Sequence, residues 1–272
     1  MYNPFSLEGR VAVVTGAGGV LCAEISMGLA KAGAKIALLD LRKDAAEIAA
    51  AKIRDAGYEA EAFECNVLEK ESIEAARDGV LAKFGKVDIL LNGAGGNHPK
   101  GTTNADMTFF DMPPEALQFV FNLNIIGTIM PTQVFGKLFA EQGSGCVVNI
   151  SSMAADRPLT RTIAYSAAKA GVTNFTQWMA THFNKEYSKN IRVNAIAPGF
   201  LITNQNYSLM IDEATGNPTP RGQDVLRSTP MDRFGDPEEL VGGVIYLCSD
   251  AAKFVNGIVL PIDGGFSAFS GV

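Results

Sequence analysis

The residues most able to do chemistry in this chain are a tyrosine and a lysine four positions apart. Tyr165 and Lys169, in the segment Tyr-Ser-Ala-Ala-Lys, lie one turn apart on one face if the segment is helical. A free phenol has a pKa near ~10 and is a poor base, but an adjacent ammonium stabilises the phenolate. Lowering the pKa by about three units would take roughly 4 kcal/mol. Such a tyrosine takes a proton from an alcohol, or returns one to a ketone, while hydride moves at the neighbouring carbon.

Two further polar residues extend this candidate site. Ser152 closes the run Asn-Ile-Ser-Ser thirteen residues before the tyrosine, and Asn124 lies in the segment Asn-Ile-Ile-Gly. A tyrosine and a lysine at this spacing are common on ordinary amphipathic helices, so the pair alone does not indicate catalysis. The four residues together favour a proton-transfer centre.

A glycine-rich turn near the start of the chain predicts a dinucleotide site. The segment Thr-Gly-Ala-Gly-Gly at residues 15–19 joins an apolar run to a helical segment, where glycine lets backbone N–H groups approach a pyrophosphate. Asp40 follows Gly16 by 24 residues at the end of the second apolar run. A carboxylate there accepts ribose hydroxyls and repels a 2′-phosphate, which favours NAD(H) over NADP(H). Arg42 and Lys43 follow it, either as a phosphate-attracting pair or as a solvated helix start.

The elements that must position these residues form a repeating pattern. Short apolar runs predict strands at 10–15, 35–39, 59–64, 87–91, 146–150, 191–196 and 257–261, and helical periodicity predicts helices at 20–32, 42–56, 70–84, 114–141 and 164–187. Strands this short and apolar are typical of a parallel sheet covered on both faces. We therefore expect one α/β domain over residues 1–272, a doubly wound Rossmann fold of about seven parallel strands.

Several predicted strands end in small or polar residues at what becomes one edge of the sheet. Cys-Asn-Val follows the third strand and Asn-Gly-Ala-Gly-Gly the fourth, although turn chemistry alone would explain each loop by itself. The interval 204–231, rich in Gly and Pro, interrupts the strand–helix rhythm. We interpret it as a lid over the crevice, with an idle surface loop as the alternative.

Composition excludes several function classes. The chain has 272 residues, 47% hydrophobic and 19% charged, with a formal net charge of −6, which argues against a nucleic-acid partner. Its four cysteines lie far apart without metal-ligand spacing, so we expect reduced, mostly buried thiols and no metal site. No basic-then-apolar leader and no run of 18 uncharged apolar residues appears, and we expect a cytoplasmic protein without a membrane span.

With these residues assembled, the chain resembles the short-chain dehydrogenase/reductase family over essentially its whole length. The resemblance rests on motifs that occur in family order and spacing: Asn92-Gly-Ala-Gly95, Asn124, Ser152, Tyr165-x-x-x-Lys169, and Pro198-Gly199 with Thr203 downstream. It implies that Tyr165 is the general acid/base. Lys169 would lower its pKa and hold the nicotinamide ribose, Ser152 would bind the substrate oxygen, and Asn124 would maintain a helix irregularity that positions a relay water.

The resemblance also implies a set of cofactor contacts, with Leu201 and Thr203 meeting the nicotinamide carboxamide. The predicted cofactor-binding residues are Gly16, Gly18, Gly19, Val20, Leu21, Asp40, Leu41, Asn66, Val67, Asn92, Ala94, Gly95, Tyr165, Lys169, Pro198, Gly199, Leu201 and Thr203. Two positions depart from the family pattern. Val20 and Cys22 stand where it has glycine, so Gly18 and Gly19 would supply the close approach, and Asn66 replaces an aspartate near the adenine, where its amide oxygen can still accept a hydrogen bond.

Segments around the predicted pocket, at 97–103, 175–178, 198–200 with 204–206, and 264–272, are similar to the subgroup of D-mannonate oxidoreductases (fructuronate reductases), relatives of the gluconate 5-dehydrogenases. This similarity implies a sugar acid, with D-fructuronate and NADH giving D-mannonate or the reverse. A hexuronate needs a cation for its carboxylate, and loop candidates include Arg221 besides the predicted substrate-binding residues Asn97, His98, Lys100, Ser152, Met153, Arg157, Arg161, Tyr165, Asn204 and Asn206. The alternatives are another sugar, polyol or keto-gluconate dehydrogenase, or a non-catalytic NAD-binding scaffold or redox sensor.

Apolar residues on more than one face of the helices around Asn124 and Tyr165 indicate subunit contacts. Packing on the sheet explains many of them, and the family resemblance implies a homotetramer. The last residues, 266–272, are apolar for a free tail, so we expect them to dock on a neighbouring subunit or line its site.

Overall fold

The computed structural model describes residues 2–203 and 206–271. Its centre is one sheet of seven parallel strands in the order β3-β2-β1-β4-β5-β6-β7. The strands are β1 Val11–Thr15, β2 Lys35–Asp40, β3 Ala60–Glu64, β4 Ile89–Asn92, β5 Gly145–Ile150, β6 Ile191–Pro198 and β7 Val259–Ile262. This order reverses direction at β1 and β4, which confirms the predicted doubly wound Rossmann fold.

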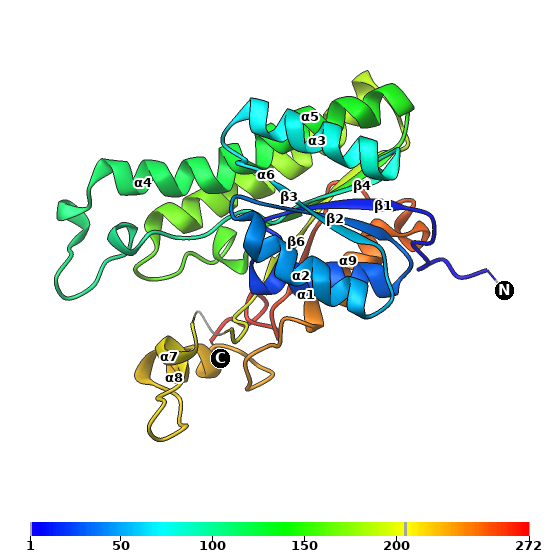
Figure 1. Cartoon of the computed structure of the whole chain (residues 1–272). Coiled ribbons are helices and arrows are strands. Elements are labelled where there is room, and N and C mark those ends of the chain that lie inside the picture. Colours follow the sequence, from blue (N-terminus) through cyan, green and yellow to red (C-terminus); the bar gives the residue numbers. More distant parts are fainter. Residues whose placement is uncertain (1, 204–205, 272) are drawn as a thin grey trace.

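Helices cover both faces of the sheet (Figure 1). One face carries α1 Val20–Lys31, α2 Lys43–Asp55 and α9 Glu239–Cys248; the other carries α3 Lys70–Phe84, α4 Pro114–Phe121, α5 Gly127–Gln142 and α6 Ile163–Glu186. Successive side chains of a strand point to opposite faces. In β1, Ala12 and Val14 therefore join the core under α1, while Val11 and Val13 join the core under α5 and α6. Burial on both faces explains why the strand sequences are apolar throughout.

The elements agree with the predictions within a few residues, with three differences. The predicted helix at 114–141 is interrupted by a π-helical segment at Asn122–Ile126. Helix α9 is the helix expected after residue 231, for which no bounds were predicted because Gly242 and Gly243 obscure its period. The interval after β6 contains two short helices, α7 Tyr207–Met210 and α8 Pro220–Arg227, instead of a structureless loop.

The helical stretch Pro114–Gln142 is, among the described residues, the one long and apolar enough to cross a membrane by length and composition. Half of its most apolar window is buried, and Phe135 and Phe139 are fully buried in the core. Packing against the sheet of this fold accounts for its hydrophobicity, as for other core helices.

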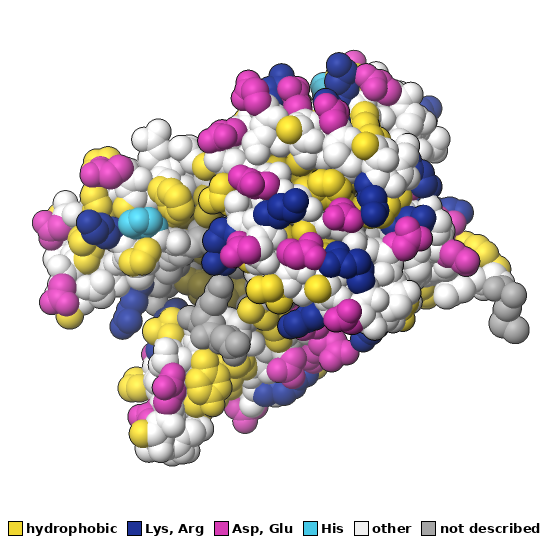
Figure 2. All heavy atoms as spheres, in the orientation of Figure 1, with side chains coloured by type: hydrophobic (Ala, Val, Ile, Leu, Met, Phe, Trp, Pro, Cys, Tyr) yellow, Lys and Arg dark blue, Asp and Glu magenta, His cyan; other side chains and the backbone are white. Residues whose placement is uncertain are grey.

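Helices α7 and α8 form a separate lobe beyond the carboxyl ends of the strands (Figure 1). An antiparallel bridge between Ile211 and Pro218 closes the turn between them, and the Thr219 hydroxyl caps α8 by accepting from the backbone N–H of Gly222 (3.0 Å). Figure 2 shows a hollow between this lobe and the part of the molecule around α4. The lobe is therefore placed where the predicted lid should lie.

Candidate active site

The carboxyl end of β5 and the start of α6 bring together three of the four predicted catalytic residues. Ser152 follows β5 after one residue, while Tyr165 and Lys169 lie in the first two turns of α6. The Lys169 ammonium is buried, donates to the Ile150 carbonyl (2.7 Å) and lies 5.6 Å from the centroid of the Tyr165 ring. The lysine is therefore beside the tyrosine, as the spacing predicts.

The electrostatics of this pair differ from the expectation. Burial raises the pKa of Tyr165, and an interaction with the Ser152 hydroxyl opposes this shift only in part. Burial also lowers the pKa of Lys169 to about 8. The direction of this shift is opposite to the predicted lowering of the tyrosine pKa, because removing a phenolate from water raises its pKa. At neutral pH Tyr165 holds its proton, ready to donate it.

The fourth residue, Asn124, is fully buried in the π-helical segment. Its amide nitrogen donates to the carbonyls of Gly96 (2.7 Å) and Val120 (2.8 Å), and its amide oxygen accepts from the Gly96 N–H (3.2 Å). A Cβ on Gly95 would lie 2.8 Å from the Asn124 Oδ1 and 3.3 Å from the Lys169 Nζ. Asn124 and Lys169 therefore flank Gly95, and the helix irregularity expected at Asn124 is present.

The glycine-rich loop has the close approaches that a pyrophosphate site needs. Gly16 has φ +66°, and a Cβ there would lie 2.8 Å from the Ala94 backbone. A Cβ on Gly18 would lie 2.7 Å from the Ala45 side chain. Gly19 precedes α1, so the N–H groups of Val20 and Leu21 belong to its first turn, where an anion is favoured. These residues fit a dinucleotide phosphate.

The departure from the family pattern at position 22 has a structural explanation. Cys22 is buried, and a Cβ on Gly93 would lie 2.2 Å from its Sγ. The thiol thus fills the space that a side chain at position 93 would need. Burial raises the pKa of Cys22 to about 12, so the thiol stays neutral and acts by packing.

Gly93→Ala is expected to destabilise the fold by about 2–3 kcal/mol, because the new methyl group overlaps Cys22 and the Thr15 carbonyl. Cys22→Gly in the same chain should recover part of that loss, and a double-mutant cycle on the free energy of unfolding measures the coupling. Gly242→Ala, with no atom near its added Cβ, is the control and should change stability little. Additive losses would contradict the packing explanation.

Asp40 ends β2 and contacts the glycine-rich loop. Its two carboxylate oxygens accept from the N–H groups of Gly18 (2.9 Å) and Arg42 (2.9 Å). A carboxylate has about four acceptor positions, so it can still bind ribose hydroxyls. Leu41, Arg42 and Lys43 are exposed beside it.

Two predicted cofactor residues have clear structural uses. The Asn66 side chain accepts from the Leu68 N–H (3.0 Å) and donates to Glu69 (2.9 Å), which leaves one lone pair of its oxygen for a ligand; Val67 beside it is buried. Asn92 is buried and donates to Thr132 and Asn149 (both 2.9 Å). The amide nitrogen of Asn92 therefore links core elements, and a contact of this residue with the cofactor stays a prediction.

The loop that contains Ala94 is held by a residue that the sequence reasoning missed. The Thr15 hydroxyl accepts from the N–H groups of Gly93 (3.1 Å) and Ala94 (3.2 Å), which ties the ends of β1 and β4 together. Its position immediately before the glycine-rich turn was the feature of the sequence that could have indicated this role.

The end of β6 approaches the end of β7. Pro198 is the last residue of β6, and a Cβ on Gly199 would lie 2.6 Å from the Asp263 backbone. Leu201 is buried, and the side chain of Asn206 accepts from the Thr203 N–H (2.8 Å) and donates to the Leu201 carbonyl (2.8 Å). Asn206, predicted to bind substrate, thus closes the turn that carries Leu201 and Thr203; Asn204 lies outside the described residues.

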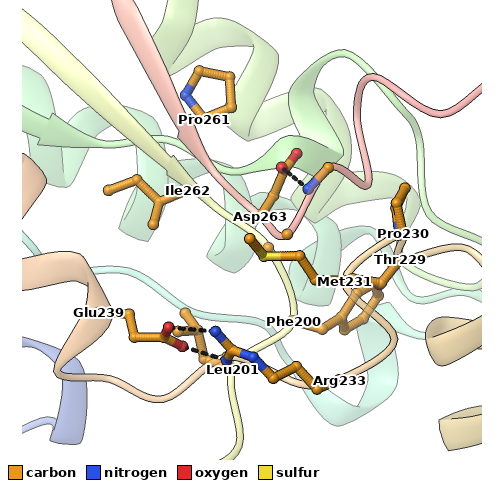
Figure 3. A pocket seen from close by; sticks show the side chains of 14 residues that line it. Phe200, Leu201, Thr229, Pro230, Met231, Arg233, Glu239, Pro261, Ile262 and Asp263 are labelled. Carbon is orange, nitrogen blue, oxygen red and sulfur yellow. Dashed lines mark hydrogen bonds and ion pairs between the residues drawn. The ribbon is translucent and has the colours of Figure 1, made fainter.

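A cavity of about 580 Å³ opens between these two strand ends (Figure 3). Gly199, Leu201 and Asp263 line it, and a bidentate pair between Arg233 and Glu239 (2.7 and 2.6 Å) borders it. The arginine holds the pKa of Glu239 at about 2. The four predicted catalytic residues do not line this cavity, so its size alone does not make it the catalytic centre.

The predicted substrate residues separate into groups. Asn97, His98 and Lys100 bond within their own turn: His98 Nδ1 accepts from the Lys100 N–H (3.1 Å), and its ring packs edge-on against Phe119 (5.4 Å). Met153 is buried behind Ser152. Arg157 and Arg161 lie on the loop between β5 and α6 but border different cavities.

The first residues of the C-terminal segment contact their own chain. Phe266 packs edge-on against Phe200 (5.6 Å), and the Ser267 carbonyl accepts from Arg157 Nε (3.2 Å) and Nη2 (3.1 Å). Residues 268–271 are exposed, so the docking of this segment on a neighbouring subunit stays a prediction.

A doubly wound sheet with a glycine-rich first turn, a carboxylate at the end of β2 and a buried lysine beside a half-buried tyrosine at its carboxyl edge defines an NAD(P)-dependent oxidoreductase of alcohol and carbonyl groups. A family model described as Enoyl-(Acyl carrier protein) reductase matches residues 17–267. The chain belongs to the short-chain dehydrogenase/reductase family.

Similar proteins cover the whole length of the chain. An uncharacterized oxidoreductase of Haemophilus influenzae is 49% identical (98% of this chain, 96% of the relative), and an uncharacterized oxidoreductase UxuB of Bacillus subtilis is 43% identical (98% of each). A crystal structure from Haemophilus influenzae with bound NAD, provisionally described as a D-mannonate oxidoreductase, superposes with a TM-score of 0.92 at 48% identity over 98% of each chain.

Relatives with named substrates are more distant. D-threitol dehydrogenase of Mycolicibacterium smegmatis is 34% identical (97% of this chain, 95% of the relative), and 5-keto-D-gluconate 5-reductase of Escherichia coli is 32% identical (97% and 98%). A 7alpha-hydroxysteroid dehydrogenase of Escherichia coli is 33% identical (95% and 94%).

Proposed function

We propose that this enzyme transfers hydride between NAD(H) and a sugar acid, with D-fructuronate reduced to D-mannonate or the reverse as the reaction. The observation that supports this chemistry is the position of the buried Lys169 beside Tyr165. Both residues lie at the carboxyl edge of the sheet, where Ser152 follows β5. The sugar-acid assignment is supported by the similarity to the Haemophilus structure and to the keto-gluconate reductase.

Each residue of the candidate active site has its own role in the proposed reaction. When bound, the nicotinamide ring accepts or supplies the hydride. Ser152 binds the substrate oxygen, and Tyr165 donates its proton to that oxygen during reduction or accepts it during oxidation. Lys169 holds the nicotinamide ribose, and Asn124 keeps the π-helical segment against Gly95 and Gly96, so that a water bound there would relay the proton to solvent.

The remaining contacts assign the cofactor. Gly16, Gly18, Gly19 and the start of α1 would hold the pyrophosphate, and Asp40 the adenosine ribose. NAD is favoured over NADP because the Asp40 carboxylate would face a 2′-phosphate. The Haemophilus structure with bound NAD supports this preference, although other related structures bind NADP.

The direct test is NADH oxidation by the purified protein with D-fructuronate, beside 5-keto-gluconate, uncharged ketoses and polyols, and a 7-keto steroid. We expect kcat/KM for D-fructuronate to exceed the values for the other compounds by at least about tenfold. A higher value for an uncharged sugar or polyol would move the assignment to another dehydrogenase. Nucleotide binding without turnover of any compound would indicate a scaffold or redox sensor.

Asp40→Ala is expected to lower kcat/KM with NADH by about 30- to 100-fold, because the variant loses two ribose hydrogen bonds to a charged acceptor. The value with NADPH should rise or stay constant, since the repulsion of the 2′-phosphate is removed. Steady-state kinetics with both cofactors measure the ratio. Asp44→Ala, an exposed carboxylate on the first turn of α2, is the control. An unchanged ratio in Asp40→Ala would refute the NAD assignment.

We also propose a cytoplasmic homotetramer, as the family resemblance implies. In support, Phe119 (44%), Phe121 (37%) and Trp178 (57%) are exposed on the outer helices, whereas Phe135 and Phe139 serve the core. Trp178 stacks on His182 beside an apolar cavity of about 380 Å³ between α5 and α6. Exposed aromatic groups of this kind mark subunit contacts, and sedimentation equilibrium would give the assembly mass.

A further inference from the structure

One cavity beside the catalytic loop is lined by two arginines. This cavity, of about 360 Å³, lies between the loop that follows Ser152, helix α8 of the lid lobe and two aromatic side chains, Phe200 and Phe266. Arg157 enters it from the loop and Arg221 from α8. Within residues 2–203 and 206–271, neither arginine forms an ion pair.

Among the residues that the structure describes, both guanidinium groups donate only to neutral acceptors. Arg157 donates to the Ser267 carbonyl through Nε (3.2 Å) and Nη2 (3.1 Å), and Arg221 Nη1 donates to the Thr160 hydroxyl (3.0 Å). A guanidinium has five N–H donors, so most of those on Arg221 and the Nη1 group of Arg157 are available for a further acceptor. The positive charge of the pair is left uncompensated by these contacts.

The other groups around the cavity favour an anion. Its single acidic residue, Asp224, is paired with Arg227 on the same helix. The Arg221 guanidinium lies 5.9 Å over the Phe200 ring, which holds it in place without neutralising it. Two arginines facing apolar walls are the arrangement that binds a carboxylate bidentately.

The position of the cavity links it to the reaction centre. Arg157 follows Ser152 by five residues on one loop, and Phe200 directly follows Gly199 at the end of β6. Arg221 reaches the cavity from the lid lobe and bridges to Thr160 of the same loop. A ligand between the arginines would therefore contact both the Ser152 loop and the lid.

The other candidate cations are placed differently. Arg161 borders a separate cavity with Thr103 and Phe109, and its backbone has φ +76°. Lys100 is exposed in the turn capped by His98. Neither shares a cavity with a second arginine.

We propose that Arg157 and Arg221 together bind the carboxylate of the substrate and thereby select sugar acids over neutral sugars. The inference rests on the proposed function, since it assigns the group that recognises the acid end of that substrate. Because the two arginines come from the core loop and from the lid lobe, a bound carboxylate also joins these two parts of the molecule.

The test compares two substrates that differ only at the acid end, D-fructuronate and D-fructose. Arg157→Gln and Arg221→Gln are each expected to lower kcat/KM for D-fructuronate by about 10- to 100-fold, mainly through KM, since each removes a charge-assisted hydrogen bond to the carboxylate. The kcat/KM for D-fructose should change by less than about threefold. Arg221→Lys keeps the positive charge but loses the paired N–H donors of the guanidinium. Its kcat/KM for D-fructuronate should lie between those of wild type and Arg221→Gln.

Arg77→Gln on α3, whose guanidinium pairs with the neighbouring Asp78 and does not line this cavity, is the control and should leave both substrates unaffected. Unfolding midpoints of all variants exclude a loss of fold. Equal losses of kcat/KM with both substrates would indicate that the arginines have a structural role and would refute the proposal. An unchanged kcat/KM for D-fructuronate would also refute it, while leaving the proposed reaction intact. If the wild-type enzyme reduces only neutral sugars, the carboxylate assignment falls together with the sugar-acid substrate, although dehydrogenase activity stands.

Discussion

Tyr165→Phe is expected to lower kcat for D-fructuronate reduction by about 10³-fold or more, because the variant has no proton to give to the developing alkoxide. The KM for NADH should remain within about threefold of wild type, since the aromatic ring that borders the nicotinamide site is retained. Stability should change little, because burial already holds the phenol neutral and raises its pKa. Stopped-flow turnover with NADH and tryptophan fluorescence for binding measure the two effects.

The matched control is Tyr187→Phe, an exposed tyrosine at the other end of the same helix, which should retain full activity. Retention of more than about a tenth of kcat in Tyr165→Phe would place the acid elsewhere. The raised pKa of Tyr165 gives a further expectation. Reduction needs the neutral phenol and should persist through neutral pH, whereas alcohol oxidation needs the phenolate and should increase as the pH rises.

Lys169→Met is expected to separate activity from stability. Turnover should fall by about 10³-fold, because the nicotinamide ribose and the proton path lose their ammonium. The free energy of unfolding at pH 7 should rise by about 1–3 kcal/mol, since burial lowers the pKa of Lys169 to about 8 and a buried ammonium costs stability. Denaturant unfolding from pH 7 to 11, compared with kcat/KM, measures both effects.

The pH dependence of stability reports the same cost of burying the Lys169 ammonium. The folded pKa of about 8 lies below the ordinary value of 10.5, so between these values the unfolded chain binds more protons and wild-type stability rises with pH. Below pH 8 the stability cost of the buried Lys169 ammonium is fully present. Lys169→Met should lose this rise, and the exposed Lys185→Met should keep it. A large loss of stability in Lys169→Met would instead show that the bond to the Ile150 carbonyl is a net stabiliser.

The sequence predicts the sheet well because burial on both faces leaves uninterrupted apolar strands. The bounds of helix α9 escaped prediction because two adjacent glycines weaken its period. One of its residues, Val241, packs so closely on Gly28 of α1 that a Cβ on Gly28 would lie 2.2 Å from the Val241 side chain. Such a close helix contact is a tertiary property. The π-helical interruption at Asn124 likewise depends on hydrogen bonds to Gly96, which is distant in the chain.

For the candidate site, spacing predicts which residues meet but not what each one does. Asn206 and His98, both predicted substrate residues, also hold turns, because short polar side chains bond readily to nearby backbone. Their contact with a substrate stays a prediction. The direction of the Tyr165 pKa shift could not be predicted either, since it depends on how far both groups are removed from water.

The packing of Phe266 on Phe200 and the hydrogen bonds from Arg157 to Ser267 have a practical consequence. Phe266 and Ser267, near the end of the described chain, thus contact the end of β6 and the loop that follows Ser152. An affinity tag or a fluorescent fusion attached at that end would pull on the same loop that holds Ser152, whereas one attached at the N-terminus would lie near the opposite edge of the sheet (Figure 1). Kinetic comparisons among variants are therefore best made with the carboxyl end unmodified.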